Sequence, residues 1–165
     1  RGMKPVIAGG AEAWVVAREL AEAGVPVILD PLENLPNDFD KLGARFDNAK
    51  LLHEAGVRIA FSQDDSFHLR KNRQLAGNAV THGLPWEAAL AAITSAPADI
   101  FGVGAARGRI EPGQAADLVL WSGDPLEVTT VAEQVWIAGN PVAMRSRQSE
   151  LRDRYLERLR TGATD

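Results

Sequence analysis

A repeated unit constrains the fold of the first two-fifths of the chain. The tetrapeptide Glu-Ala-Gly-Val occurs at residues 22–25 and again at 54–57. In both copies an amphipathic segment precedes the glycine, which can take the left-handed conformation that ends a helix. A continuous apolar run follows each time, and such runs are typical of strands that a parallel sheet buries on both faces. The sequence therefore predicts alternating helices and strands.

Three strand-and-helix units can be placed in this region. We expect strands near residues 5–8, 25–30 and 57–61, and a helix at 11–23. A doubly wound sheet and a (β/α)8 barrel both fit this pattern. In either architecture the loops at the carboxyl ends of the strands carry the functional side chains. The long polar segments that follow the second and third strands are therefore the candidate site.

The remaining sequence changes in character. Residues 68–101 are mostly helical in pattern, whereas residues 108–144 contain short apolar runs separated by Pro-Gly, Ser-Gly-Asp-Pro and Gly-Asn-Pro turns. We expect a hairpin across Gly139 and Asn140. The apolar residues of the last segment are four apart, at Leu151, Tyr155 and Leu159. This spacing predicts a terminal amphipathic helix that docks one apolar stripe, with a basic membrane-surface helix as the alternative.

Composition excludes several classes of protein. The absence of cysteine excludes disulfides, cysteine-ligated zinc, iron–sulfur clusters and a thiol nucleophile. A net charge of −4 disfavours nucleic acid as a partner, because phosphate binding needs a basic surface. No apolar run reaches the length that spans a bilayer. We expect a soluble protein with a small-molecule substrate and no nucleic-acid or membrane partner. The sequence leaves the compartment unknown, and the cytoplasm and the periplasm both stay open.

The most specific motif is Gly-Arg-Ile-Glu-Pro-Gly-Gln-Ala-Ala-Asp-Leu-Val-Leu at 108–120. It resembles the carboxy-terminal portion of the amidohydrolase superfamily, and within it the imidazolonepropionase-related amidohydrolases. The helical stretch at 89–103 is similar to the one that precedes this motif in the family. The resemblance implies an α/β fold with three regions. Residues 1–103 would form part of a (β/α)8 metal-dependent hydrolase barrel (strands six to eight), residues 104–145 a small β-sandwich lobe, and residues 146–165 an amphipathic helix.

A (β/α)8 barrel needs about 250 residues, and this chain supplies three of its units. The resemblance therefore implies a fragment of a longer protein, with the family's His-x-His pair and strand-five ligand upstream of Arg1. We expect the fragment alone to be inactive. The inner face of its open barrel, assigned to Val27, Leu29, Ile59 and Phe61, would lack cover. A homo-oligomer, or pairing with the missing amino-terminal portion, would supply that cover.

The resemblance also implies the chemistry, which is metal-dependent hydrolysis of non-peptide C–N bonds of the cyclic amide or amidine class. Phe61-Ser62-Gln63-Asp64 aligns with the family's Phe-Gly-Thr-Asp, which makes Asp64 the strand-eight metal ligand and catalytic acid/base. A slip of one residue would assign this role to Asp65. The alternative is an acidic turn or helix cap with no catalytic role. The cofactor would be a divalent metal, with zinc expected, bound in the complete protein and absent from the fragment.

Other side chains of the same two loops are candidate substrate contacts. Glu33 and Asn34 follow the second strand, and Phe67, His68 and Arg70 follow the third. Each can equally be a solvated loop side chain. The first strand ends in Ala8, Gly9 and Gly10, where the family commonly has a histidine ligand, and none of these residues binds a metal. This departure supports a second hypothesis, a non-catalytic scaffold or assembly module with a degenerate metal site.

Overall fold

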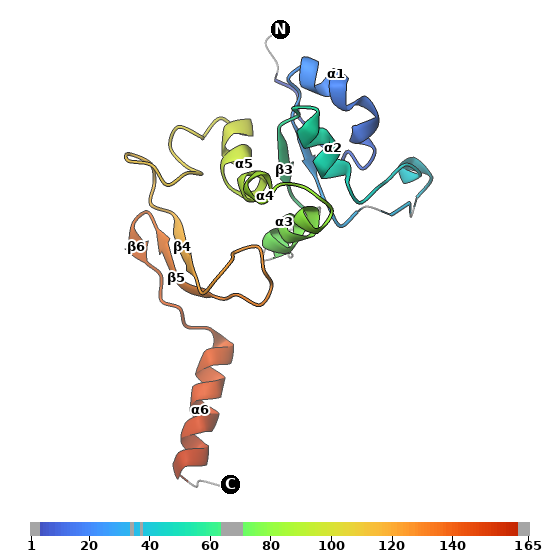
Figure 1. The fold of residues 1–165 in the computed structure, drawn as a ribbon. Helices are drawn as coiled ribbons and strands as arrows, with labels where there is room; N and C mark the ends of the chain where they lie inside the picture. The colour runs from blue at the N-terminus through green and yellow to red at the C-terminus, as the bar shows by residue number, and fades with distance from the viewer. Residues whose placement is uncertain (1–3, 34, 37, 64–70, 162–165) are drawn as a thin grey trace.

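The computed structural model describes residues 4–33, 35–36, 38–63 and 71–161 as an α/β protein with two small sheets (Figure 1). Alternating strands and helices make up its first half. These elements are β1 (Ile7–Ala8), η1 (Ala13–Val16), α1 (Ala17–Glu22), β2 (Val27–Leu29), η2 (Phe39–Lys41), α2 (Asn48–Glu54) and β3 (Ile59–Phe61). The three predicted strands are therefore present, although their hydrogen-bonded parts are shorter than the sequence runs suggest.

The strands β1, β2 and β3 form a parallel sheet in sequence order. Val27 of β2 pairs with both Ile7 and Ile59, so the register is continuous across the sheet. All three residues of β3 are buried, as expected for a strand covered on both faces. The repeated glycines end the helices as predicted, because Gly24 and Gly56 both adopt positive φ.

One prediction about the sheet is wrong, because the residues assigned to the inner barrel face lie on the helix-covered face. Val27, Leu29, Ile59 and Phe61 are at most 5% exposed and belong to the main hydrophobic core. That core includes Leu52 of α2 and Leu75 of the following helix. Ala8, Ile28 and Ala60, which alternate with these core residues, line a pocket, and Phe61 at the end of β3 also reaches it. A continuous apolar run identifies a buried strand but does not say which face meets the helices.

Three helices follow β3, and a second sheet comes after them. The helices are α3 (Asn72–Thr81), α4 (Trp86–Ile93) and α5 (Ser95–Ile100), and the strands are β4 (Leu118–Trp121), β5 (Ala132–Ile137) and β6 (Asn140–Pro141). The second sheet is antiparallel, in the order β4-β5-β6. Its hairpin turns at Ala138 and Gly139, both at positive φ, so the predicted turn is correct in kind but one residue too late.

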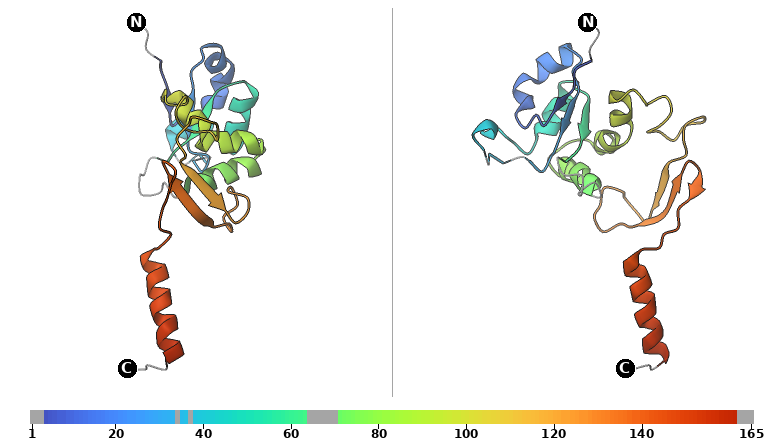
Figure 2. Two further views of the ribbon diagram at one scale, coloured as in Figure 1. Left: turned by 90° about the vertical axis from the view of Figure 1, so that its left-hand side faces the viewer. Right: turned by 180° about the vertical axis from the view of Figure 1, so that it is seen from behind.

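The terminal helix α6 (Arg147–Thr161) extends away from both sheets (Figures 1 and 2). The helix was predicted, but its docking is not seen among the described residues. Tyr155 is 58% exposed and Leu159 is 80% exposed, so the apolar stripe faces solvent. None of the described helices has the length and apolarity needed to cross a bilayer.

Candidate active site at the strand ends

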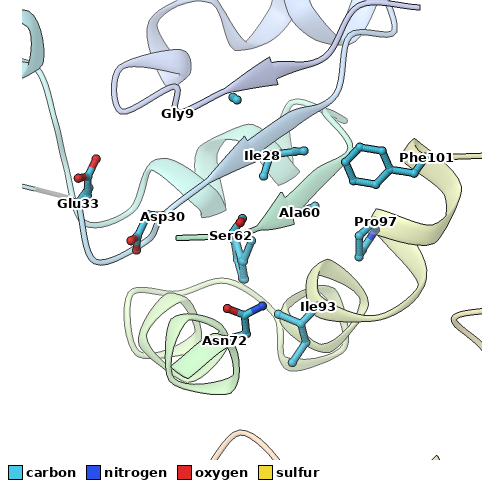
Figure 3. Close-up of a pocket in the computed structure, with 12 residues that line it drawn as sticks. Gly9, Ile28, Asp30, Glu33, Ala60, Ser62, Asn72, Ile93, Pro97 and Phe101 are labelled. Carbon is cyan, nitrogen blue, oxygen red and sulfur yellow. The ribbon is translucent and has the colours of Figure 1, made fainter. Parts of the chain in front are cut away.

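A pocket of about 380 Å³ lies where the three parallel strands end (Figure 3). The carboxyl ends of parallel strands meet at one edge of the sheet, which brings together residues distant in sequence. The pocket is lined by Ala8, Gly9, Ile28, Asp30, Glu33, Ala60, Phe61, Ser62, Asn72, Ile93, Pro97 and Phe101. It is thus built from the ends of β1, β2 and β3, the start of α3, and the segment from α4 to the end of α5.

Polar side chains gather at the strand ends. Asp30 follows β2 and accepts a hydrogen bond from the backbone N–H of Leu32 at 2.8 Å. Glu33 forms an ion pair with Lys41 of η2, with 2.9 Å between the carboxylate oxygen and Nζ. Ser62 follows β3, and its hydroxyl donates to the carbonyl of Gln63 at 3.3 Å. This part of the pocket is rich in hydrogen-bond acceptors.

Asn72, the first residue of α3, completes the polar part of the pocket. Its carboxamide points from the helix toward Ser62 at the end of β3 (Figure 3). The side-chain oxygen Oδ1 is buried and has no hydrogen-bond partner among the residues that the structure describes. Sequence reasoning missed this residue, because an asparagine at the start of a helix carries no distinctive catalytic signal.

The rest of the pocket wall is apolar. Ile28 and Ala60 contribute from the sheet, and Ile93, Pro97 and Phe101 face them from the helical side (Figure 3). Phe101 is 67% exposed, which is high for an aromatic side chain beside a cavity. The pocket therefore combines a polar end with an apolar wall, as ligand sites commonly do.

A buried asparagine fixes the loop that follows β1. Asn48 is 5% exposed, and its Nδ2 donates to the carbonyls of Gly10 and Ala11 at 2.9 and 3.2 Å. Its Oδ1 accepts from the backbone N–H of Trp14 at 3.1 Å. Gly10 has φ of +67°, and a Cβ there would lie 2.9 Å from Val27. The hydrogen bonds of Asn48 thus hold the end of β1 beside the pocket. A side chain larger than hydrogen at Gly10 would disturb this arrangement.

An ion pair fastens the helical wall of the pocket to the motif at 108–120. Arg109 donates from both terminal nitrogens to Asp99 of α5, at 3.0 and 2.6 Å. The hydrogen bond from Arg109, assisted by its charge, holds the pKa of Asp99 below its ordinary value. Gln114 also accepts from the backbone N–H of Arg109 at 3.1 Å. These polar residues of the motif therefore have a structural role.

Comparison with protein families identifies the chain. Residues 10–143 match the model described as the amidohydrolase family. This chain belongs to the amidohydrolase family. The motif at 108–120 and the strands β2 and β3 lie within the matched region, and β1 lies just before it. The resemblance drawn from the sequence is therefore confirmed at the level of the superfamily.

Solved structures place this amidohydrolase chain among proteins of the TIM-barrel superfamily. An amidohydrolase from Thermotoga maritima has a TM-score of 0.79 and 35% identity, covering 85% of this chain and 37% of that protein. An adenosine deaminase from Xanthomonas campestris, solved with bound zinc, has a TM-score of 0.57 and 24% identity, covering 94% of this chain and 42% of its own. The second likeness shows the fold alone.

A curated relative is also an amidohydrolase. Amidohydrolase tasK of Hapsidospora irregularis is 40% identical over 91 residues, which cover 54% of this chain and 9% of tasK. The chain therefore spans less than half the length of the Thermotoga structure and less than a tenth of tasK.

The described residues of this amidohydrolase do not by themselves form a metal site. Within those residues there is no group of three or more histidine, cysteine, aspartate or glutamate side chains that could hold an ion. A zinc site normally has at least three protein ligands, and the pocket lining offers the carboxylates of Asp30 and Glu33. His82 stacks against Phe46 with ring centroids 4.7 Å apart, and neither it nor His53 lines the pocket.

Most of the predicted site residues fall outside the described part of the chain. These are Asn34, Asp64, Asp65, Phe67, His68 and Arg70, and their assigned roles stay predictions. Glu33 is described and lines the pocket, and its role as a substrate contact stays a prediction. Ala8 and Gly9 line the pocket at the end of β1, so this strand end contributes no metal-binding side chain.

Proposed function

We propose that this chain forms one side of the active site of a metal-dependent hydrolase that cleaves non-peptide C–N bonds of the cyclic amide or amidine class. The observation that carries the proposal is the pocket at the carboxyl ends of three parallel strands, with Asp30, Glu33 and Ser62 at its polar end. Membership of the amidohydrolase family supports the hydrolase class. The narrower likeness to imidazolonepropionase-related enzymes stays a prediction.

We infer further that β1, β2 and β3 are consecutive strands of a (β/α)8 barrel, and that β4, β5 and β6 belong to a β-sandwich lobe beside it. Strands that follow one another in the sequence are also neighbours in the parallel sheet, as in an arc of a barrel. The chain covers 37% of the Thermotoga structure that it matches over 85% of its own length. In this proposal other residues of a longer protein complete both structures.

The residues that follow the strands are assigned separate roles in this proposal. Asp64, which follows Ser62 and Gln63 in the sequence, takes up and releases the proton during C–N cleavage. Glu33, Asn34, Phe67, His68 and Arg70 contact the substrate. A bound divalent metal, with zinc expected, supplies an activated water. Because the described residues do not make up a ligand set, we propose that residues outside this chain hold most of the metal's coordination sphere.

Metal analysis and activity screening test this proposal. The complete polypeptide that contains these residues is compared with the 165-residue chain, using a panel of cyclic amides and amidines. We expect a stoichiometric divalent metal and turnover in the complete protein, and neither in the shorter chain. Stoichiometric metal and turnover by the 165-residue chain would show that no further ligands are needed. A complete protein lacking both would rule out the enzyme class.

A second candidate function is a non-catalytic scaffold that keeps the amidohydrolase architecture. The observation in its favour is the end of β1, where Ala8 and Gly9 line the pocket without offering a metal ligand. Asp64→Asn in the complete protein separates the two functions. A fall in hydrolysis of about a hundredfold or more, the usual contribution of a general acid/base, supports the enzyme. No hydrolysis by the parent protein, together with an unchanged structure in Asp64→Asn, supports the scaffold.

We also propose that another polypeptide segment or a second copy covers the open edges of the parallel sheet. Among the described strands, β1 and β3 each have a partner on one side only. Val6, next to β1 in the sequence, and Val15 and Val16 of η1 are exposed apolar residues. Such edges and patches favour association. Light scattering of the 165-residue chain at tens of micromolar should show an oligomer, and a clean monomer would contradict this part of the proposal.

A further inference from the structure

The side-chain oxygen of Asn72 is a buried acceptor without a partner among the described residues. Asn72 lines the pocket, and Oδ1 has no hydrogen bond among the described residues. A buried polar atom without a partner destabilises a protein, so native structures contain few of them. Because Asn72 lines a pocket, a bound ligand could supply the missing hydrogen bond to its oxygen.

The side chain next to Asn72 contacts the second sheet and its loop. The next residue, Arg73, donates from Nη1 to the carbonyl of Glu127 and to Oγ1 of Thr130, both at 3.0 Å. Its guanidinium also lies over the ring of Trp121 at 4.8 Å. Arg73 therefore fixes the first turn of α3 against the second sheet, while Asn72 faces the pocket.

The surroundings of Asn72 indicate the kind of group that completes its hydrogen bonding. Ser62 lies opposite its carboxamide (Figure 3). Asp30 lines the same polar end, and an ionised carboxylate is an acceptor only. A ligand that fits this end must therefore bring hydrogen-bond donors. A turn of the Asn72 carboxamide about χ2, which is a broad torsion in asparagine, presents Oδ1 to such a ligand.

We propose that Asn72 is a substrate-binding residue whose side-chain carbonyl accepts a hydrogen bond from an N–H of a cyclic amide or amidine. This inference rests on the proposed function and adds a specificity determinant to it. A site built to bind an N–H group discriminates against a substrate in which that hydrogen is replaced, because the acceptor is then left unpaired. Asn72 thus selects secondary amides and amidines with a free N–H over their N-methylated analogues.

The test compares two substrates in three forms of the complete protein. The substrates are a cyclic amide with a free N–H and its N-methylated analogue. The variants are Asn72→Leu, which keeps the approximate shape but removes the amide, and the matched control Asn78→Leu. Asn78 is in the same helix and also has a buried Oδ1 without a described partner, but it does not line the pocket.

We expect Asn72→Leu to lower the ratio of kcat/KM for the N–H substrate to that for the N-methyl substrate by about tenfold, the effect of one lost hydrogen bond. Asn78→Leu should leave this ratio unchanged. Neither variant should lower the thermal midpoint, because each removes an unpartnered buried oxygen. If Asn72→Leu impairs folding, Asn72→Ala decides, because it also removes the acceptor oxygen and should lower the ratio in the same way.

The outcomes distinguish failure of this inference from failure of the proposed function. An unchanged substrate ratio in a folded Asn72→Leu protein overturns this inference and leaves the proposed hydrolase function standing. A ratio that falls equally in Asn78→Leu assigns the effect to α3 as a whole and also overturns the inference. Absence of turnover by the parent protein on every C–N substrate overturns the proposed function, and the role of Asn72 in it.

Discussion

The guanidinium of Arg73 lies 4.8 Å from the centroid of the Trp121 ring and donates to the carbonyl of Glu127 at 3.0 Å. This contact joins α3, which begins at the candidate site, to β4 and the loop that follows it. A second contact runs alongside, because Trp86 of α4 donates its indole N–H to Asp124 at 2.9 Å. The second sheet is therefore fastened to the helices that form the pocket wall.

Replacing Arg73 tests this connection. Arg73→Ala removes the stacking on Trp121 and the hydrogen bonds to the loop, so we expect the free energy of unfolding to fall by about 1–2 kcal/mol. Denaturant titration measures this loss. Arg154→Ala, at an exposed position on α6, serves as the control and should change stability by less than about 0.5 kcal/mol. Equal effects of the two substitutions would contradict the anchoring role.

Gly77 allows the close approach of α3 to the loop between β4 and β5. A Cβ at this position would lie 2.6 Å from the backbone oxygen of Leu126. Alanine normally stabilises a helix interior by about 1 kcal/mol relative to glycine. The steric conflict should outweigh this gain, so we expect Gly77→Ala to destabilise the protein by about 1–3 kcal/mol. A thermal midpoint at or above that of the parent would show that the backbone of Leu126 yields without cost.

The exposed position Gln74 in the same helix provides the comparison for Gly77. Gln74→Ala brings a strong helix former into α3 without approaching the loop at Leu126. Its thermal midpoint should stay within a degree or two of the parent value. A loss as large as that of Gly77→Ala would assign the effect to the helix itself instead of the contact.

Asn48 should be the most sensitive polar residue of the first half. Asn48→Ala leaves the carbonyls of Gly10 and Ala11 and the N–H of Trp14 without their side-chain partner. Because Asn48 is buried, we expect a loss of about 2–4 kcal/mol of unfolding free energy. Asn48→Asp keeps the shape but loses the donor and should also destabilise. If chemical denaturation gives Asn48→Asp the same free energy of unfolding as the parent, the hydrogen bonds from Asn48 to the carbonyls of Gly10 and Ala11 do not stabilise the fold.

The ion pair between Asp99 and Arg109 predicts a pH dependence of stability. The hydrogen bond from Arg109 lowers the pKa of Asp99 below its ordinary value of 3.8. A carboxyl group with a lowered pKa in the folded state stabilises the protein above its unfolded-state pKa. That contribution is lost as pH falls through the folded-state pKa. Asp99→Asn should therefore have a lower thermal midpoint than the parent at pH 7.

The difference in thermal midpoint between Asp99→Asn and the parent should become smaller as pH falls below 3.8, the ordinary pKa of the carboxyl group. Thermal unfolding of both proteins from pH 7 to the lowest pH at which the parent folds measures it. A gap that stays constant over this range would mean that Asp99 stabilises the fold without its charge.

Local signals made part of the fold predictable. Gly24 and Gly56 end their helices through their own backbone conformation, so the strands that follow them could be placed from sequence. The side of the sheet that meets the helices could not be placed in this way. Val27 and Ile28 are both apolar, and only the packing of distant residues such as Leu52 decides which of them enters the core.

The exact position of the hairpin turn also could not be predicted from local sequence. The sequence pointed to Gly139 and Asn140, yet Asn140 pairs with Ile137 in the sheet. The turn lies one residue earlier because the backbone N–H of Ala138 donates to the side chain of Asp117 at 2.8 Å. This partner lies twenty-one residues away along the chain and holds a non-glycine residue at positive φ.

The candidate site was predictable in position but not in composition. Parallel strands place functional loops at their carboxyl ends, and the pocket lies there, with Glu33 in its wall. Asn72 was missed because its significance depends on an unpartnered oxygen beside a cavity, and only a three-dimensional structure reveals such an atom.

The central claim, that the pocket at the strand ends is the catalytic mouth of a C–N hydrolase, can be tested by site-directed labelling. The 165 residues contain no cysteine, so Ser62→Cys introduces one thiol into this region at an exposed position on the pocket wall. Ser146→Cys, placed just before α6 and away from the pocket, is the control. Both are made in the complete protein and labelled with a bulky thiol reagent.

The deciding measurement is the turnover of a cyclic amide by each variant before and after complete labelling. The account predicts that labelled Ser62→Cys loses at least nine-tenths of its turnover (an order-of-magnitude expectation for a blocked pocket) and that bound substrate slows its labelling. Labelled Ser146→Cys should keep its activity. Full turnover by completely labelled Ser62→Cys would contradict the account.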